Sequence, residues 1–297
     1  MKNIIVVTGG AGFVGSNLIS FLLKKTSYQI LSLDNYSSGS KKNHIKSNRV
    51  NYLNCHTKNI SKKLNNKKNK INAIFHFGEF ARIYQSFLMM NQCIDSNTIG
   101  SNEVFNFCMK NKIKLIYSAT SASLGNKGND KNLSPYSFTK AKNLELLNNL
   151  KKWFNFKFEI IYFYNVYGPK QICKGKMATV IGIFEEHYKK SLPLPIVKPG
   201  TQTRRFTHIS DTVDTCIEAW IKNKCKLYSI SHKQSYSIIE VAKMFKRKIK
   251  FIPYRKGERF ASALTKMSLS NKVYLKYGKV NLKEYINNFV SNNSSKN

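Results

Sequence analysis

Tyr136 and Lys140 are the pair of side chains in this sequence best suited to proton transfer. Residues four positions apart share one face of a helix. Removing a proton from a hydroxyl group near neutral pH needs a base, and a nearby ammonium group favours the phenolate form of tyrosine. The sequence therefore predicts that Tyr136 is a catalytic base and that Lys140 assists it.

The surroundings of this pair matter, because a chain with 16 Tyr and 43 Lys contains such spacings by chance. Ser134 and Pro135 precede the pair and suit the cap and first residue of a helix, which we expect over 136–154. Hydroxyl side chains crowd at the end of the preceding predicted strand, at Ser118, Thr120, Ser121 and Ser123.

Glycines at positions 9, 12 and 15 form a second motif, between a predicted strand at 4–8 and a predicted helix at 13–25. Glycine at such positions allows a tight turn and a close approach of backbone to a pyrophosphate, and the helix N-terminus attracts the same anion. The motif is informative because a strand precedes it and a helix follows it. The expected cofactor contacts here are Gly9, Gly12, Phe13, Val14 and Gly15.

Asp34 ends the second predicted strand, where an acid binds the adenosine ribose and repels a 2′-phosphate. The sequence thus favours NAD over NADP, with Asn35 beside the same site, although Lys41 and Lys42 lie close enough to favour the phosphate.

Strand and helix patterns alternate through the first half, which predicts an α/β fold with a doubly wound parallel sheet. Further strands are expected at 30–34, 51–55, 73–77, 114–118 and 159–163, and a further helix at 94–110. After Gly168 the pattern loosens, with helices expected at 178–190, 211–221, 238–245 and 282–289. We expect a cofactor domain at 1–167, joined by a returning segment at about 203–233, and a smaller lobe at 168–202 and 234–297.

The net charge of +35 raises the question of a nucleic-acid partner. The basic residues are 43 Lys and only 7 Arg, whereas nucleic-acid readers depend on Arg, so we read the lysines as a solvated surface. Six scattered cysteines without a C-x-x-C pair argue against disulfides and against a metal site. No signal peptide or membrane span is recognisable, so we expect a cytoplasmic protein with no membrane partner.

Together these motifs resemble the extended short-chain dehydrogenase/reductase family, which includes UDP-glucose 4-epimerases and nucleotide-sugar 4,6-dehydratases. The similarity extends to Phe163–Pro169, to Arg204–Asp211 and to the turn from Tyr254 to Glu258. It implies a Rossmann fold, NAD as cofactor, a nucleotide-diphosphate sugar as substrate, and a homodimer formed through the helices at 94–110 and 136–154.

The resemblance also implies roles for individual residues. Thr120 would hydrogen-bond the reacting hydroxyl, and Tyr136 and Lys140 would be catalytic and also touch the cofactor. The other implied contacts are His76 and Asn97 to the cofactor, and Asn165, Arg204 and Arg255 to the sugar nucleotide.

The residues after Thr120 bear on the reaction. The family's 4,6-dehydratases carry Asp-Glu there, whereas this chain has Ser121 and Ala122. Removal of the C5 proton therefore lacks the carboxylate that the dehydratases use for it. Chemistry at C4 is left, which predicts a 4-epimerase acting through a transient 4-keto sugar. The alternatives are a 4-dehydrogenase or 4-keto reductase, a 4,6-dehydratase, and a non-catalytic NAD(H)-binding protein.

Several residues depart from the family pattern. The segment from His76 to Arg82 replaces the usual small residues, so that Glu79 and Arg82 either contact the substrate or pair with each other. His56 and Arg205 each stand where the family usually has Asp.

Overall fold

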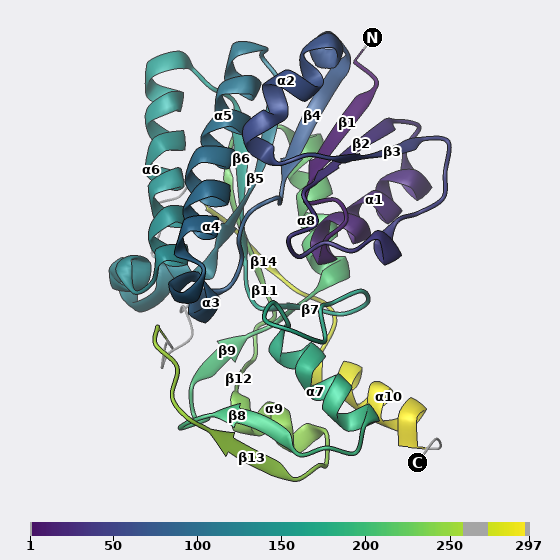
Figure 1. Cartoon of the computed structure of the whole chain (residues 1–297), viewed down its shortest axis with the longest axis vertical. Coiled ribbons are helices and arrows are strands. Elements are labelled where there is room, and N and C mark those ends of the chain that lie inside the picture. The colour runs from purple at the N-terminus through teal and green to yellow at the C-terminus, as the bar shows by residue number, and fades with distance from the viewer. Residues whose placement is uncertain (1, 258–272, 295–297) are drawn as a thin grey trace.

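An eight-stranded sheet forms the centre of the computed structural model, which describes residues 2–257 and 273–294 (Figure 1). Glu258, the last residue of the turn that supports the family resemblance, lies outside the described residues. All neighbouring strands of the sheet pair in parallel, in the order β14-β11-β6-β5-β4-β1-β2-β3. The strands are β1 (Ile4–Thr8), β2 (Gln29–Asp34), β3 (Val50–Asn54), β4 (Ile71–His76), β5 (Lys114–Thr120), β6 (Phe158–Phe163), β11 (Leu227–Ser231) and β14 (Val273–Tyr277).

The chain starts in the middle of this sheet and winds outwards in both directions. From β1 it runs to β2 and β3 at one edge, and it then crosses to β4 and continues towards the other edge. The carboxyl ends of β1 and β4 therefore border a crevice, the place where open α/β sheets bind ligands. The predicted doubly wound parallel sheet is confirmed.

Helices cover both faces of the sheet through two separate apolar cores. On one face lie α1 (Phe13–Lys25) and α8 (Ile209–Lys222), and on the other lie α2 (Ile60–Leu64), α5 (Ser101–Lys110) and α6 (Pro135–Phe154). Helix α6 begins as the sequence predicts, because the Ser134 hydroxyl accepts a hydrogen bond from the Ser137 N–H and Pro135 opens the helix.

The single helix expected over 94–110 is wrong in one respect, because a π-helical turn at 95–100 separates α4 (Met90–Ile94) from α5. Gly100 lies in this turn and packs so closely that an added Cβ would lie 2.2 Å from the Thr57 hydroxyl. The wider turn also holds Asn97, which is fully buried. A short helix, α3 (Ile83–Leu88), precedes α4 and was not expected.

A smaller lobe packs below the carboxyl edge of the sheet around a third apolar core (Figure 1). Its helices are α7 (Val180–Lys189), α9 (Ile238–Met244) and α10 (Leu282–Ser294). Short strand pairs complete it and join it to the sheet: β7 (Val166–Tyr167) with β10 (Thr207–His208), β8 (Leu194–Val197) with β13 (Ile249–Ile252), and β9 (Thr203–Arg205) with β12 (Ser235–Ser237). Strand β14 comes from the segment assigned to the lobe but forms an edge of the large sheet, and the domain division stays a prediction.

All six cysteines are free thiols, and four of them are buried. Within the described ranges, every helix is too short or too polar to cross a bilayer.

Candidate functional site

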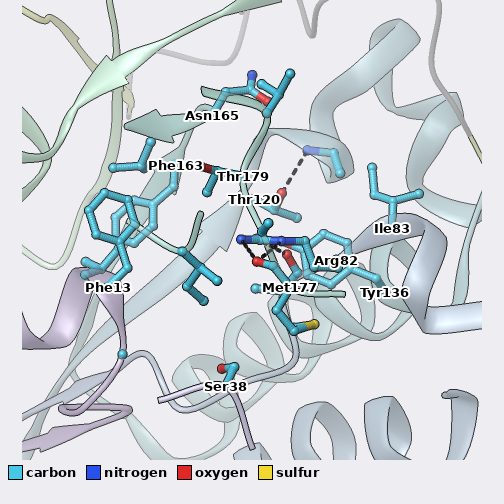
Figure 2. Close-up of a pocket in the computed structure, with 18 of the residues that line it drawn as sticks. Phe13, Ser38, Arg82, Ile83, Thr120, Tyr136, Phe163, Asn165, Met177 and Thr179 are labelled. Carbon is cyan, nitrogen blue, oxygen red and sulfur yellow. Dashed lines mark hydrogen bonds between the residues drawn. The ribbon is translucent and has the colours of Figure 1, made fainter. Parts of the chain in front are cut away.

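A cavity of about 500 Å³ lies at the carboxyl edge of the sheet and continues into the lobe. This volume lies within the usual range of ligand pockets. The cavity brings together residues that are up to 246 positions apart in sequence, from Gly9 to Arg255. Figure 2 shows part of its lining, with Phe13, Thr120 and Asn165 among the labelled residues. All but two of the predicted site residues line it: Gly9, Gly12, Phe13, Val14, Gly15, Asp34, Asn35, Glu79, Arg82, Thr120, Tyr136, Lys140, Asn165, Arg204 and Arg255.

The glycine turn after β1 forms one wall of this cavity. Gly9 has a φ of +70°, a left-handed conformation that favours glycine, and an added Cβ on Gly15 would lie 2.2 Å from the Gly9 carbonyl oxygen. No side chain caps the N-terminus of α1 at Gly12, so the first-turn N–H groups remain available to a ligand. The turn therefore fits a pyrophosphate, as expected for NAD.

Asp34 stands beside the turn at the end of β2 and is 7% exposed. Its carboxylate accepts hydrogen bonds from the Ala11 N–H at 2.9 Å and from the Tyr36 N–H at 2.8 Å. Burial raises the pKa of the Asp34 carboxyl group, and these two hydrogen bonds oppose that effect. The same carboxylate thus braces the turn and faces the cavity.

Thr120, Tyr136 and Lys140 lie together on the next part of the cavity wall. Thr120 ends β5, and its hydroxyl accepts a hydrogen bond from the Ala122 N–H at 3.1 Å. Tyr136 is half-buried in the first turn of α6, where the Ser86 hydroxyl oxygen accepts a hydrogen bond from its backbone N–H. The Lys140 side chain is buried, and its ammonium group donates to the Ser118 carbonyl oxygen. All three residues of the expected trio therefore line the cavity.

Glu79 and Arg82 do not pair with each other. The Glu79 carboxylate forms an ion pair with Lys140, whereas the Arg82 Nε donates to the Met177 carbonyl oxygen at 2.9 Å. Burial lowers the pKa of the Arg82 guanidinium group, and its electrostatic interaction with nearby Tyr136 opposes this effect. Arg82 thus connects the loop after β4 to the lobe while standing close to the phenol.

His76 and Asn97 are the two predicted site residues that do not line the cavity. Both are fully buried behind it. The His76 ring lies between the Thr8 hydroxyl, 2.7 Å from Nδ1, and the Ser101 hydroxyl, 3.0 Å from Nε2. Asn97 exchanges hydrogen bonds with the backbone of Phe80 through its Oδ1 and Nδ2 atoms. These side chains support the loop after β4 rather than face the cavity.

A further part of the cavity lining includes Asn165, Arg204 and Arg255. Asn165 has a positive φ of 36°, and its amide donates to the Arg205 carbonyl oxygen at 2.7 Å. The Arg255 guanidinium group stacks 5.3 Å from the centre of the Tyr84 ring. The cavity lining thus includes the planar cations of Arg204 and Arg255.

Sequence reasoning missed several lining residues of the lobe, among them Met177, Thr179 and Gln202. Gln202 is 2% exposed; its Nε2 donates to the Val197 carbonyl oxygen, and its Oε1 is buried without a partner among the described residues. The sequence signal that could have identified Gln202 was its position two residues before Arg204.

His56, which stands where the family usually has Asp, lies outside the cavity lining and pairs with Asp95 at 3.2 Å.

Comparisons with known proteins agree with this geometry. The model of a family described as the NAD dependent epimerase/dehydratase family matches residues 5–230. ADP-L-glycero-D-manno-heptose-6-epimerase from Brachyspira hyodysenteriae is 30% identical over 264 residues, which cover 82% of this chain and 80% of that protein.

Two solved structures share the fold along essentially the whole chain. UDP-glucose 4-epimerase from Thermus thermophilus, in complex with NAD, has a TM-score of 0.84 at 21% identity and covers 98% of this chain and 99% of its own. UDP-N-acetylglucosamine 4-epimerase from Methanobrevibacter ruminantium, in complex with UDP-N-acetylmuramic acid, has a TM-score of 0.84 at 23% identity and covers 100% of both chains. The match from residue 5 to residue 230, joined to a cavity walled by a glycine turn and a Tyr-Lys pair, shows that the chain belongs to the NAD dependent epimerase/dehydratase family.

Proposed function

We propose that this chain is a nucleotide-sugar 4-epimerase that acts through a transient 4-keto sugar. The observation that carries the proposal is a cavity whose lining combines the glycine turn with Thr120, Tyr136 and Lys140 and with Arg204 and Arg255. Bound NAD supplies the hydride acceptor and donor for such a reaction. The protein's part is to position the sugar and to move one proton.

In the proposed cycle Tyr136 takes the proton of the 4-hydroxyl group while the C4–H bond breaks, and it returns the proton after the ketone is reduced on its other face. Thr120 hydrogen-bonds the same oxygen. Arg204 and Arg255 hold the diphosphate, since planar guanidinium groups match phosphate oxygens. Asn165 and the buried acceptor of Gln202 contact the rest of the nucleotide sugar.

The carboxylates of the cavity favour epimerisation over loss of water. Among the described lining residues the acids are Asp34 and Glu79, and both are held by the protein. Ser121 and Ala122, which follow Thr120, carry no acid. A dehydratase needs a group that removes the C5 proton and one that protonates the leaving hydroxyl, and neither of these two described acids is free for that task.

The proposal is tested by incubating the purified protein with UDP-, GDP- and ADP-sugars and identifying the products by NMR. We expect inversion at C4 with no net change in NADH absorbance. Lasting NADH formation or consumption would instead indicate the dehydrogenase or reductase, and a product lacking water the dehydratase. Inversion at C6 would instead indicate a 6-epimerase, the activity in the name of the Brachyspira relative. Tight NAD binding without any turnover would support a non-catalytic protein.

The Asp34 carboxylate is proposed to set the preference for NAD over NADP. We expect Asp34→Asn to raise the affinity for NADP⁺ relative to NAD⁺ by about tenfold, because it removes a charge that repels the 2′-phosphate while keeping one acceptor oxygen. Competition against NADH fluorescence measures both affinities. Asp95→Asn, which removes a carboxylate paired with Lys58 outside the cavity, is the control. An unchanged ratio would assign the preference to other residues.

A homodimer formed through the helices at 94–110 and 136–154 remains part of the proposal. Ile99 and Phe138 belong to these two segments and are 50% and 44% exposed. Light scattering of the purified protein would give its mass in solution. A cytoplasmic location is likewise proposed.

A further inference from the structure

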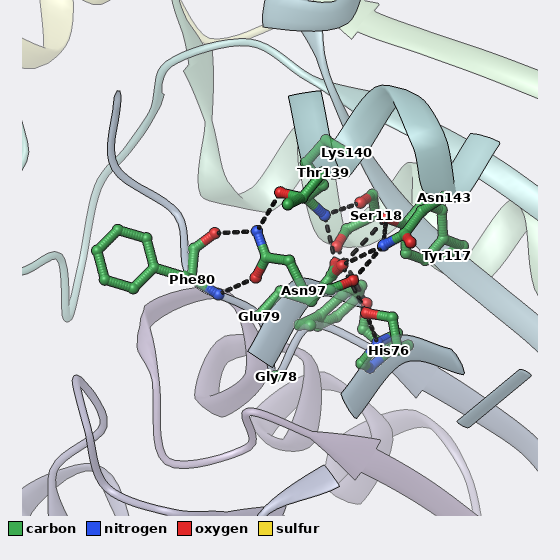
Figure 3. A network of polar contacts seen from close by, with 12 residues as sticks. His76, Gly78, Glu79, Phe80, Asn97, Tyr117, Ser118, Thr139, Lys140 and Asn143 are labelled. Carbon is green, nitrogen blue, oxygen red and sulfur yellow. Dashed lines mark hydrogen bonds and ion pairs between the residues drawn. The ribbon is translucent and has the colours of Figure 1, made fainter. Parts of the chain in front are cut away.

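Glu79 is the residue of this site whose contacts are most unlike those expected of a substrate ligand. Its side chain is 2% exposed and is surrounded by donors (Figure 3). Oε1 lies 2.8 Å from the Ser101 hydroxyl, 3.1 Å from the Tyr117 hydroxyl and 3.1 Å from the Asn143 amide nitrogen, and Oε2 accepts from the Lys140 ammonium group. The protein itself therefore uses both oxygens.

The direction of these hydrogen bonds is fixed by a chain that starts at the glycine turn. The Thr8 hydroxyl oxygen accepts from the backbone N–H groups of Phe77 and Gly78, so its proton points to His76 Nδ1. Burial lowers the pKa of His76 to about 4, which leaves a neutral ring whose Nε2–H donates to Ser101. Ser101 then donates to Glu79. Every partner of the carboxylate is thus a donor, as a negative charge requires.

Lys140 is held by the same network. Its ammonium group donates to Glu79 and to the Ser118 carbonyl oxygen, and it also lies over the Tyr117 ring, 4.7 Å from the ring centre. The side chain is 5% exposed and still lines the cavity. A buried ammonium group would present a full positive charge to a bound ligand, and the adjoining carboxylate offsets that charge.

We propose that Glu79 is a positioning residue that acts through Lys140, fixing its ammonium group and offsetting its charge towards the cofactor. A nicotinamide ring is cationic when oxidised and neutral when reduced, so an unbalanced lysine would favour NADH over NAD⁺. The Glu79–Lys140 ion pair therefore allows the cavity to bind NAD⁺. A reaction that begins by oxidising the sugar requires this oxidised form of the cofactor. This inference depends on NAD binding and not on the identity of the sugar.

The test compares the dissociation constants of NAD⁺ and NADH, measured by NADH fluorescence and by competition, in the full-length protein after removal of bound nucleotide. We expect Glu79→Gln to shift the ratio of the two affinities towards NADH by roughly tenfold. Glu79→Asp keeps the charge and should retain most of the original ratio. Lys140→Met, which leaves the carboxylate unbalanced, should shift the ratio towards NAD⁺.

Glu159→Gln is the matched control. Glu159 is also a fully buried glutamate, paired with Lys114 at 3.3 Å and bonded to the N–H groups of Cys225 and Lys226, but it lies near the start of β6 outside the cavity lining. Its replacement should lower the melting temperature and leave the ratio unchanged.

A purely structural role for Glu79 would weaken both cofactor forms equally, and a ratio in Glu79→Gln within twofold of the original would overturn the proposal. If that variant does not fold, Lys140→Met decides the matter, because an unchanged ratio there also contradicts it. Failure of every sugar in the product assay leaves this measurement intact, since it needs no sugar. The two proposals can therefore fail separately.

Discussion

Tyr136→Phe should lower kcat by about 10³-fold while the affinity for NAD⁺ changes by less than about twofold. The substitution removes the phenol oxygen and keeps the ring. Helix α6 should persist, because Ser134 and Pro135 form its start and the contact of residue 136 with Ser86 is made by the backbone N–H. The rate is measured with the nucleotide sugar identified in the product assay.

Tyr28→Phe is the control for this experiment. Tyr28 is half-buried against Trp220, with ring centres 5.4 Å apart, and lies outside the cavity lining. Its loss of a hydroxyl should not change kcat. If Tyr136→Phe kept activity within about fivefold of the original, another group would have to be the base, and the proposed cycle would be wrong.

Gly15→Ala should weaken cofactor binding more than the replacement of any polar residue in the cavity. The new Cβ would lie 2.2 Å from the Gly9 carbonyl oxygen and 2.7 Å from the Gly10 Cα. Both atoms belong to backbone, so the turn must move away from α1. If restoring the binding-competent turn costs about 3 kcal/mol in the Gly15→Ala protein, its affinity for the cofactor falls by roughly 100-fold or more.

Titration with NADH, followed by fluorescence, measures this loss. Gly175→Ala is the control, because nothing lies within 4 Å of the added Cβ and residue 175 is outside the cavity lining. Its φ of +78° makes alanine unfavourable there, so some stability should be lost without any effect on NADH affinity. An unaffected affinity in Gly15→Ala would show that the pyrophosphate does not bind at this turn.

The sequence predicted the sheet well where each element carries its own local signal. Strand β1 and helix α1 have the predicted bounds, since a short run of buried apolar residues ends at a glycine turn. Helix α6 begins within one residue of its predicted start because Ser134 and Pro135 mark it. The short strands of the lobe carry no such periodicity, and neither β8 nor β9 was predicted.

The network behind the cavity could not be predicted, because its contacts join residues far apart in sequence. The sequence offered Arg82, three positions away, as a partner for Glu79, whereas the actual partner is Lys140, 61 positions away. The family resemblance implied that His76 and Asn97 contact the cofactor. The structure instead shows them hydrogen-bonded to Ser101 and to the backbone of Phe80, outside the cavity lining. Asn97 also lies in the π-helical turn, which a helical sequence pattern does not reveal.

Strand β14 is synthesised well after β11, the strand with which it pairs. It pairs with β11 at the edge of the sheet although 41 residues separate Ser231 from Val273, and Asp211 accepts hydrogen bonds from the N–H groups of Lys279 and Val280 just beyond it. A growing polypeptide on the ribosome would expose the unpaired backbone of β11 until these residues emerge. Nascent chains halted before residue 273 should therefore self-associate or recruit chaperones, because an open strand edge pairs readily with other chains.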